Sequence, residues 1–153
     1  ILEHFSQADG EAGRVIIFTN LRESVQHIVT MLCRHTDVVS AKAFIGQGGG
    51  AGGAGMKQSE QKKVLQEFRA GAFNTLVATC IGEEGLDIPA VDLIVCFDGA
   101  ASPTRNIQRM GRTGRHKEGR VVYILAEGKE ENDYNRNQEV THNLHRQLRN
   151  GGG

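Results

Sequence analysis

The sequence has no excess of charge of either sign, because 18 basic side chains balance 18 acidic ones over 153 residues. Its net charge therefore points to neither a polyanionic nor a membrane partner, and a surface for nucleic acid has to be a local patch. No apolar run approaches the roughly 20 residues of a membrane span. The first residues also lack the basic region and long apolar stretch of a signal peptide. We expect neither a membrane partner nor a secretory leader.

Cysteines and metal-ligand patterns are scarce as well. The three cysteines lie far apart and form no CxxC pair, and the six histidines show no metal-ligand spacing. An odd number of scattered cysteines favours a reducing compartment, the cytosol or the nucleus. We therefore expect no metal site in this chain.

Short apolar runs alternate with stretches of helical periodicity. Strands are predicted at residues 14–20, 38–45, 75–79, 93–97 and 120–125. Helices are predicted at 21–35 and 58–70, after the cap residue Ser102, and from Glu127 onward. This alternation indicates an α/β fold with a parallel sheet that is covered on both faces. Ligands of such sheets bind beyond the carboxyl ends of the strands, so the chemistry is expected just after Thr19, Thr79 and Asp98 and around the helix that follows Ser102.

The main domain is predicted to span residues 14–135. Residues 1–13 read as the tail of a preceding amphipathic helix and a linker, and 136–153 as a C-terminal helix and flexible tail. Residues 48–55 are nearly all glycine and alanine, which predicts a mobile surface loop. A phosphate-binding loop is the sharper alternative there, but the required GKS or GKT is missing.

The strongest motif is residues 108–115 (QRMGRTGR). Its arginines recur at spacings of three, and two planar, permanently charged guanidinium groups placed together can grip a triphosphate. The glycines allow the backbone to approach closely. The alternative interpretation is a solvated basic helix.

A second motif, residues 78–89 (ATCIGEEGLDIP), begins at a strand end and turns through two glycines. Asp87 is suited to accept hydrogen bonds from a ribose, and Thr79 to reach a phosphate. The alternative is an ordinary acidic loop, since glycine-rich loops after strands are common.

Together these stretches resemble motifs V and VI of superfamily 2 helicases. Residues 15–19 (VIIFT) resemble motif IV, and 56–61 (MKQSEQ) with 68–71 (FRAG) resemble the helix of motif IVa. All occur in the right order, and the resemblance covers roughly residues 14–133. It implies a RecA-like, three-layer domain with a mostly parallel sheet between helices, the C-terminal lobe of a helicase.

Within the superfamily, residues 83–88 (EEGLDI) are similar to the group of Dicer, the RIG-I-like receptors and the Fanconi anaemia M, Hef and Mph translocases. The Dicer and RIG-I-like proteins usually carry GRxRA in motif VI, whereas residues 111–115 here are GRTGR. With 91–98, Ser102-Pro103 and 127–131 (EGKEE), the chain most resembles the Fanconi anaemia M family.

This resemblance implies roles around ATP. Arg112 and Arg115 match arginine fingers, and Gln108 matches the residue that organises the γ-phosphate and its water. Gly85 and Asp87 match motif V positions near the ribose and phosphates.

It also implies contacts to a nucleic-acid backbone, from Thr19, Gln58 and Thr79. One position departs from the family: Gln61 stands where arginine is frequent, so a backbone contact is doubtful there. Residues 105–120 carry six Lys and Arg side chains against one acidic residue, and no aromatic is interleaved. Such a patch favours phosphate contacts over base stacking.

The missing motifs define the mechanism. The chain has no GxxxxGK[ST] to cradle phosphates and no DEAD- or DEAH-like motif to hold Mg²⁺, and phosphoryl transfer needs both. The resemblance implies that an N-terminal RecA-like lobe supplies them and that this chain alone is inactive. It further implies an ATP-dependent DNA helicase or translocase that remodels forks and D-loops with DNA-repair partners, in the nucleus, or in the cytoplasm of an archaeon. An RNA-directed lobe and a non-catalytic binding or regulatory domain are the alternatives.

Overall fold

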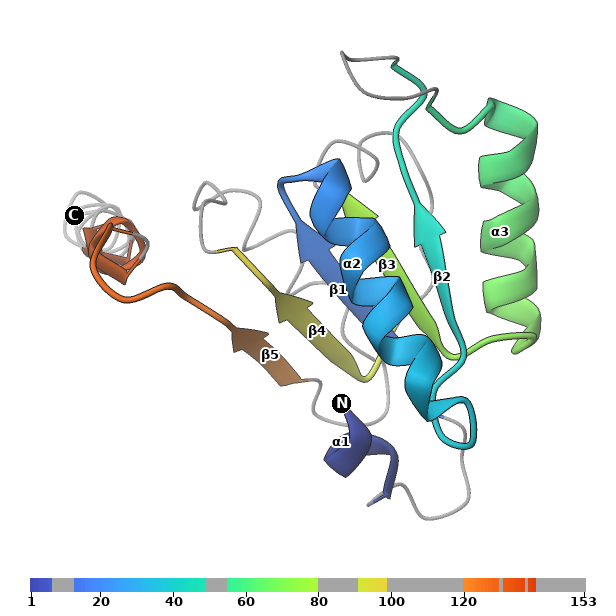
Figure 1. Ribbon diagram of the computed structural model, residues 1–153, viewed down its shortest axis with the longest axis horizontal. Helices are drawn as coiled ribbons and strands as arrows, with labels where there is room; N and C mark the ends of the chain where they lie inside the picture. Colours follow the sequence, from blue (N-terminus) through green and yellow to red (C-terminus); the bar gives the residue numbers. More distant parts are fainter. Residues whose placement is uncertain are drawn as a thin grey trace, which may run out of the picture.

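A computed structural model describes residues 1–6, 13–48, 55–79, 91–98, 120–129, 131–136 and 138–139 (Figure 1). Its strands are β1 (Val15–Thr19), β2 (Ala41–Phe44), β3 (Thr75–Thr79), β4 (Leu93–Cys96) and β5 (Arg120–Tyr123). They form one sheet in the order β2-β3-β1-β4-β5, and every neighbouring pair is parallel. The predicted α/β fold with a parallel sheet is confirmed.

The helices are α1 (Leu2–Ser6), α2 (Arg22–Leu32), the 3-10 helix η1 (Cys33–His35) and α3 (Gln58–Ala70). Helix α3 has the predicted bounds and ends at Gly71, whose φ of 80° is a left-handed conformation that favours glycine. Residues 131–136 are also helical, as predicted for the chain after Glu127. Within these described ranges, no helix has the length and apolar character to cross a membrane.

The strands predicted at 14–20, 93–97 and 120–125 are one or two residues shorter than expected, and two other elements are shortened more. The helix predicted over 21–35 ends at Leu32, where its apolar face ends; the next residues are exposed and tighten into η1. The strand predicted over 38–45 begins only at Ala41, because the backbone N–H groups of Val38 and Val39 both donate to the His35 carbonyl, at 3.0 and 2.8 Å. A turn bonded in this way cannot join the strand ladder.

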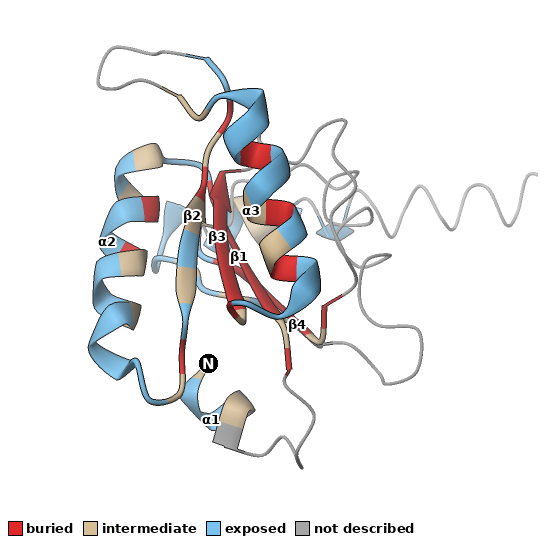
Figure 2. Cartoon of the chain, turned by 90° about the vertical axis from the view of Figure 1, so that its right-hand side faces the viewer, coloured by how far each residue is buried: buried red, intermediate tan, exposed pale blue. Residues whose placement is uncertain are grey.

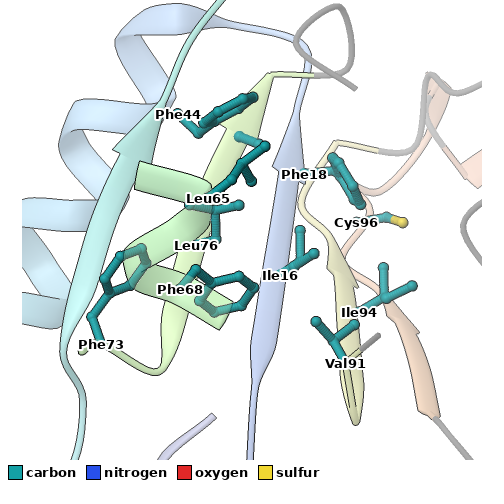
Figure 3. Packing of buried hydrophobic residues seen from close by; sticks show 11 residues of the cluster. Ile16, Phe18, Phe44, Leu65, Phe68, Phe73, Leu76, Val91, Ile94 and Cys96 are labelled. Carbon is teal, nitrogen blue, oxygen red and sulfur yellow. The ribbon is translucent and has the colours of Figure 1, made fainter. Parts of the chain in front are cut away.

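Helices α2 and α3 lie on opposite faces of the sheet, as Figures 1 and 2 show. The chain crosses from β1 to β2 in one direction and from β2 to β3 in the other, and right-handed crossovers then place the two helices on opposite sides. The α3-side cluster comprises Ile16, Phe18, Phe44, Leu65, Phe68, Phe73, Leu76, Ala78, Val91, Ile94 and Cys96 (Figure 3). The α2-side cluster comprises Val15, Ile17, Val25, Ile28, Val77, Leu93 and Val95. The three predicted layers are thus present.

Helix α1 contributes to the same core. Ile1 and Phe5 pack against the α2-side cluster, so this segment covers part of the sheet. The division of the chain at residue 13 stays a prediction.

Arg14 fastens the amino end of the central strand to two other elements. Its backbone N–H donates to Asp92 Oδ2 at 2.7 Å, and the Asp92 N–H donates back to the Arg14 carbonyl at 2.9 Å. The Arg14 guanidinium donates to the carbonyl of Arg69 in the last turn of α3 at 2.7 Å. It also lies 5.9 Å from the centroid of the Phe68 ring. One residue therefore connects β1, β4 and α3.

The edge strand β2 carries an exposed ion pair to α3. Lys42 Nζ bonds to the Glu67 carboxylate, and this hydrogen bond lowers the pKa of Glu67. The same ammonium group lies 5.2 Å from the centroid of the Phe73 ring. Exposed pairs add little stability, but a lysine on an edge strand discourages pairing with another chain.

The two segments that begin and end the glycine-rich loop predicted at 48–55 lie close together, an arrangement that we call the closed base of the loop. The Arg22 guanidinium donates to the carbonyls of Gly46 and Gly48. Across the loop, a Cβ atom placed on Gly55 would lie 2.3 Å from the Gly46 carbonyl oxygen. The two ends of the loop are therefore in contact, while its middle lies outside the described residues.

Deleting residues 49–54 should leave the melting temperature nearly unchanged, because the loop ends already meet and loop-closure entropy varies slowly with length. Gly55→Ala should lower it by several degrees, since backbone atoms cannot yield cheaply to the added Cβ and overpacking costs about 1–3 kcal/mol. Thermal denaturation followed by circular dichroism measures both. A large drop on deletion, or none for Gly55→Ala, would contradict the closed base.

Candidate functional site at the carboxyl edge of the sheet

The carboxyl ends of the parallel strands meet at one edge of the sheet. Thr19 ends β1 and Thr79 ends β3, and the two residues are partners in the register. Both are buried, with 0% and 3% of their surface exposed. The fold therefore brings together two of the three residues that the helicase resemblance assigns to the nucleic-acid backbone.

The third residue, Gln58, is the first residue of α3 and is exposed. Because α3 runs back along the sheet after β2, its first turn lies at the same edge as Thr19 and Thr79 (Figure 1). The Glu60 carboxylate accepts the backbone N–H of Lys57 at 2.8 Å and satisfies one unpaired donor at the helix start. Gln58 thus stands on a well-defined helix terminus.

Asp98, two residues beyond the end of β4, holds the end of β1. Its Oδ2 accepts the Thr19 hydroxyl at 2.8 Å. The backbone N–H of Asn20 donates to both carboxylate oxygens, at 2.9 and 2.8 Å. The Leu21 N–H in turn donates to the Thr19 hydroxyl oxygen at 3.4 Å. The exits of β1 and β4 are therefore joined through one carboxylate.

This junction lies at the topological switch point of the sheet. From β1 the chain crosses toward β2, whereas β5 lies on the other side, next to β4. The exits of β1 and β4 therefore diverge, and ligands of open α/β sheets bind in the crevice that such a divergence creates. The position where Asp98 meets Thr19 is the expected position for a functional site.

Gln61 has an internal role in this structure. Its exposed fraction is 2%, and its Nε2 donates to the Ile45 carbonyl at 2.8 Å. Its Oε1 accepts from Gln47 Nε2 at 3.2 Å. The amide thus connects α3 to the segment after β2, at the position where the family frequently has arginine.

Three residues at this edge were missed as site candidates by sequence reasoning: Asn20, Arg22 and Asp98. Arg22 opens α2 and brings a permanent positive charge to the exit of β2 through its bonds to the loop carbonyls. Asp98 marked only the end of a strand in the sequence. The sequence did contain a usable signal: the acidic Asp98 follows one apolar run, and the polar pair Thr19 and Asn20 ends another.

The residues assigned to ATP lie outside the described residues, so their roles stay predictions: Gly85, Asp87, Gln108, Arg112 and Arg115. In the part of the chain that is described, no group of three or more His, Cys, Asp or Glu side chains could hold a metal ion. Asp98 already receives the Thr19 hydroxyl and the Asn20 N–H.

A family model described as the helicase conserved C-terminal domain matches residues 1–117. The match covers more than half of the chain, which therefore belongs to this family.

Similar proteins narrow the family. An Arabidopsis thaliana protein named DEAD-box ATP-dependent RNA helicase FANCM is 51% identical, over 99% of this chain and 11% of its own length. ATP-dependent DNA helicase MPH1 of Coccidioides immitis is 46% identical, over 89% of this chain and 13% of its own. The crystal structure of the Pyrococcus furiosus Hef helicase domain is 44% identical with a TM-score of 0.66, over 88% of this chain and 26% of that one. These matches confirm the resemblance to the Fanconi anaemia M, Hef and Mph group and the RecA-like fold, and this chain spans only a small part of its relatives.

Thr19→Val should lower the free energy of unfolding by about 1.5–3 kcal/mol, because it removes a hydrogen bond to a charged group while keeping the side-chain shape. In an Asp98→Ala background the same substitution should cost clearly less, since the hydroxyl no longer has its partner. Urea denaturation of the four proteins in this double-mutant cycle measures the coupling. Additive costs would show that the bond between Thr19 and Asp98 contributes nothing.

Proposed function

We propose that the chain is the second motor lobe of an ATP-dependent superfamily 2 DNA helicase or translocase that remodels branched DNA, such as forks and D-loops, in genome maintenance. The observation that carries this proposal is the gathering of Thr19, Thr79 and Gln58 at one carboxyl edge of a helicase-family lobe. The names of the Arabidopsis and Coccidioides relatives, both called ATP-dependent helicases, support it.

ATP binds between this lobe and the N-terminal lobe, which contributes the phosphate cradle and the Mg²⁺ ligands. Gly85 and Asp87 contact the ribose and phosphates. When the lobes close, Arg112 and Arg115 reach the γ-phosphate, and Gln108 organises the attacking water. Negative charge grows on the transferring oxygens at that moment, so the arginine contacts are worth more in the transition state than in the ground state.

Closure also moves the nucleic-acid edge. The contacts between the nucleic-acid backbone and the edge formed by Thr19, Gln58 and Thr79 shift relative to those of the first lobe, and hydrolysis reopens the cleft, so each cycle advances the motor on DNA. The basic patch of residues 105–120 contributes phosphate contacts that are independent of base sequence. The protein then acts in the nucleus, or in the cytoplasm of an archaeon, with DNA-repair proteins as partners.

An RNA-directed motor is the second candidate, because the Arabidopsis relative is named an RNA helicase. DNA is favoured by the name of the Coccidioides relative and by the GRTGR form of motif VI. That same intact motif argues against a non-catalytic domain. ATP hydrolysis by the two-lobe protein, measured with branched DNA and with duplex RNA, decides between them; stronger stimulation by RNA would overturn the DNA assignment.

The 153-residue chain alone should not hydrolyse ATP, because the phosphate cradle and the Mg²⁺ site lie in the other lobe. It should bind DNA weakly and without sequence preference, and raising the salt concentration should weaken binding further. ATPase and fluorescence-anisotropy titrations test both statements. DNA-stimulated turnover by this chain above a buffer control, or binding that is insensitive to salt, would refute them.

In the two-lobe protein, Arg112→Ala and Arg115→Ala should each reduce DNA-stimulated kcat by about 10³–10⁵, while KM for ATP changes far less. Arg112→Lys should rescue poorly, because an ammonium group lacks the planar guanidinium geometry. Arg34→Ala is a matched control: Arg34 is an exposed arginine in η1 at the opposite edge of the sheet, and its loss should leave kcat unchanged. Near wild-type kcat in both finger variants would show that the site is misassigned.

A further inference from the structure

The end of β1 carries two polar residues with different environments. Thr19 is completely buried, and its single hydroxyl proton is donated to Asp98. Asn20 is exposed, while its backbone N–H is held between the two oxygens of the same carboxylate. The Thr19 hydroxyl is therefore already committed within the protein, and of these two residues Asn20 is the one exposed to solvent.

We propose that Asp98 is a positioning residue for DNA binding and that Asn20, rather than the Thr19 hydroxyl, makes the contact to the phosphate backbone. The proposal rests on the proposed function, since it assigns the groups through which the same edge meets DNA. An amide side chain is a suitable neutral donor to a phosphate oxygen.

The arrangement also explains how a carboxylate is tolerated beside a polyanion. Both oxygens of Asp98 accept hydrogen bonds from the protein, and the residue is partly buried. The Thr19 hydroxyl and the Asn20 N–H thus stabilise its negative charge by donating hydrogen bonds to it. Those three bonds fix the peptide that carries the Asn20 side chain and so reduce the conformational freedom that DNA binding would otherwise have to remove.

The chain offers a matched control for this residue. Asp92 joins the same two strands at their other end, where its carboxylate accepts the backbone N–H of Arg14 at 2.7 Å. Asp92 and Asp98 therefore share residue type, strand pair and kind of bond. They differ in the edge of the sheet that they hold, and only the carboxyl edge is assigned to DNA.

The test uses the full-length two-lobe protein and a branched DNA as the probe. For wild type, Asp98→Ala, Asp98→Asn, Asn20→Ala and Asp92→Ala, the DNA concentration that gives half-maximal ATPase stimulation is measured together with KM for ATP and the melting temperature. Asp98→Ala and Asn20→Ala should each raise the half-maximal DNA concentration about tenfold, with KM for ATP nearly unchanged. Asp98→Asn keeps an acceptor oxygen and should give a smaller shift.

Asp92→Ala should lower the melting temperature about as much as Asp98→Ala but leave the half-maximal DNA concentration at the wild-type value. An equal shift in Asp92→Ala would show that lost stability causes the effect and would overturn the proposal. Wild-type titration curves for Asp98→Ala or Asn20→Ala would overturn it as well, although the proposed function would stand. Absence of DNA stimulation in the wild-type protein would instead refute the proposed function itself.

Discussion

The central position of β1 is the constraint on which the rest of the lobe depends. All five of its residues are buried, and it pairs with β3 on one side and β4 on the other. Its side chains alternate between the two apolar clusters, so both helical layers pack against it. Because this strand is packed on both faces and paired on both sides, its position is well defined. The residues that directly follow it are therefore held in place as well.

The two edges of the sheet use similar chemistry for different purposes. At the amino edge, the Asp92 carboxylate accepts the Arg14 backbone N–H, and the Asn74 side chain accepts the Ser40 N–H and donates to the Val38 carbonyl. No functional site is assigned to this edge. At the carboxyl edge, bonds of the same kind hold Thr19 and Asn20 where the chain paths diverge. The difference arises from topology, since crevices open only beyond the carboxyl ends of parallel strands.

Apolar periodicity was sufficient to predict the layers, and the bounds of β3 and α3 were correct because Gly71 and the apolar face of α3 define them locally. The bond between Thr19 and Asp98 joins residues 79 positions apart, and no local pattern reports such a contact. Gln61 was noted in the sequence only as a departure from arginine in motif IVa, and its hydrogen bonds to Ile45 and Gln47 give its amide an internal role. The sequence thus predicted the edge of the sheet that holds the candidate site, while the packing of distant residues determines which side chains are exposed at that edge.

The two carboxylates that flank β4, those of Asp92 and Asp98, have a mechanical consequence. A parallel pair that slips by two residues keeps every side chain on its own face, so apolar patterning alone does not prevent that slip. The carboxylates of Asp92 and Asp98 accept the backbone N–H groups of Arg14 and Asn20. The two acceptors are as far apart in the sequence as the two donors. A strand that slides along its neighbour would have to break the hydrogen bonds of both carboxylates at once. The two strands therefore resist sliding as one unit, which is a property that the proposed motor function requires of this lobe.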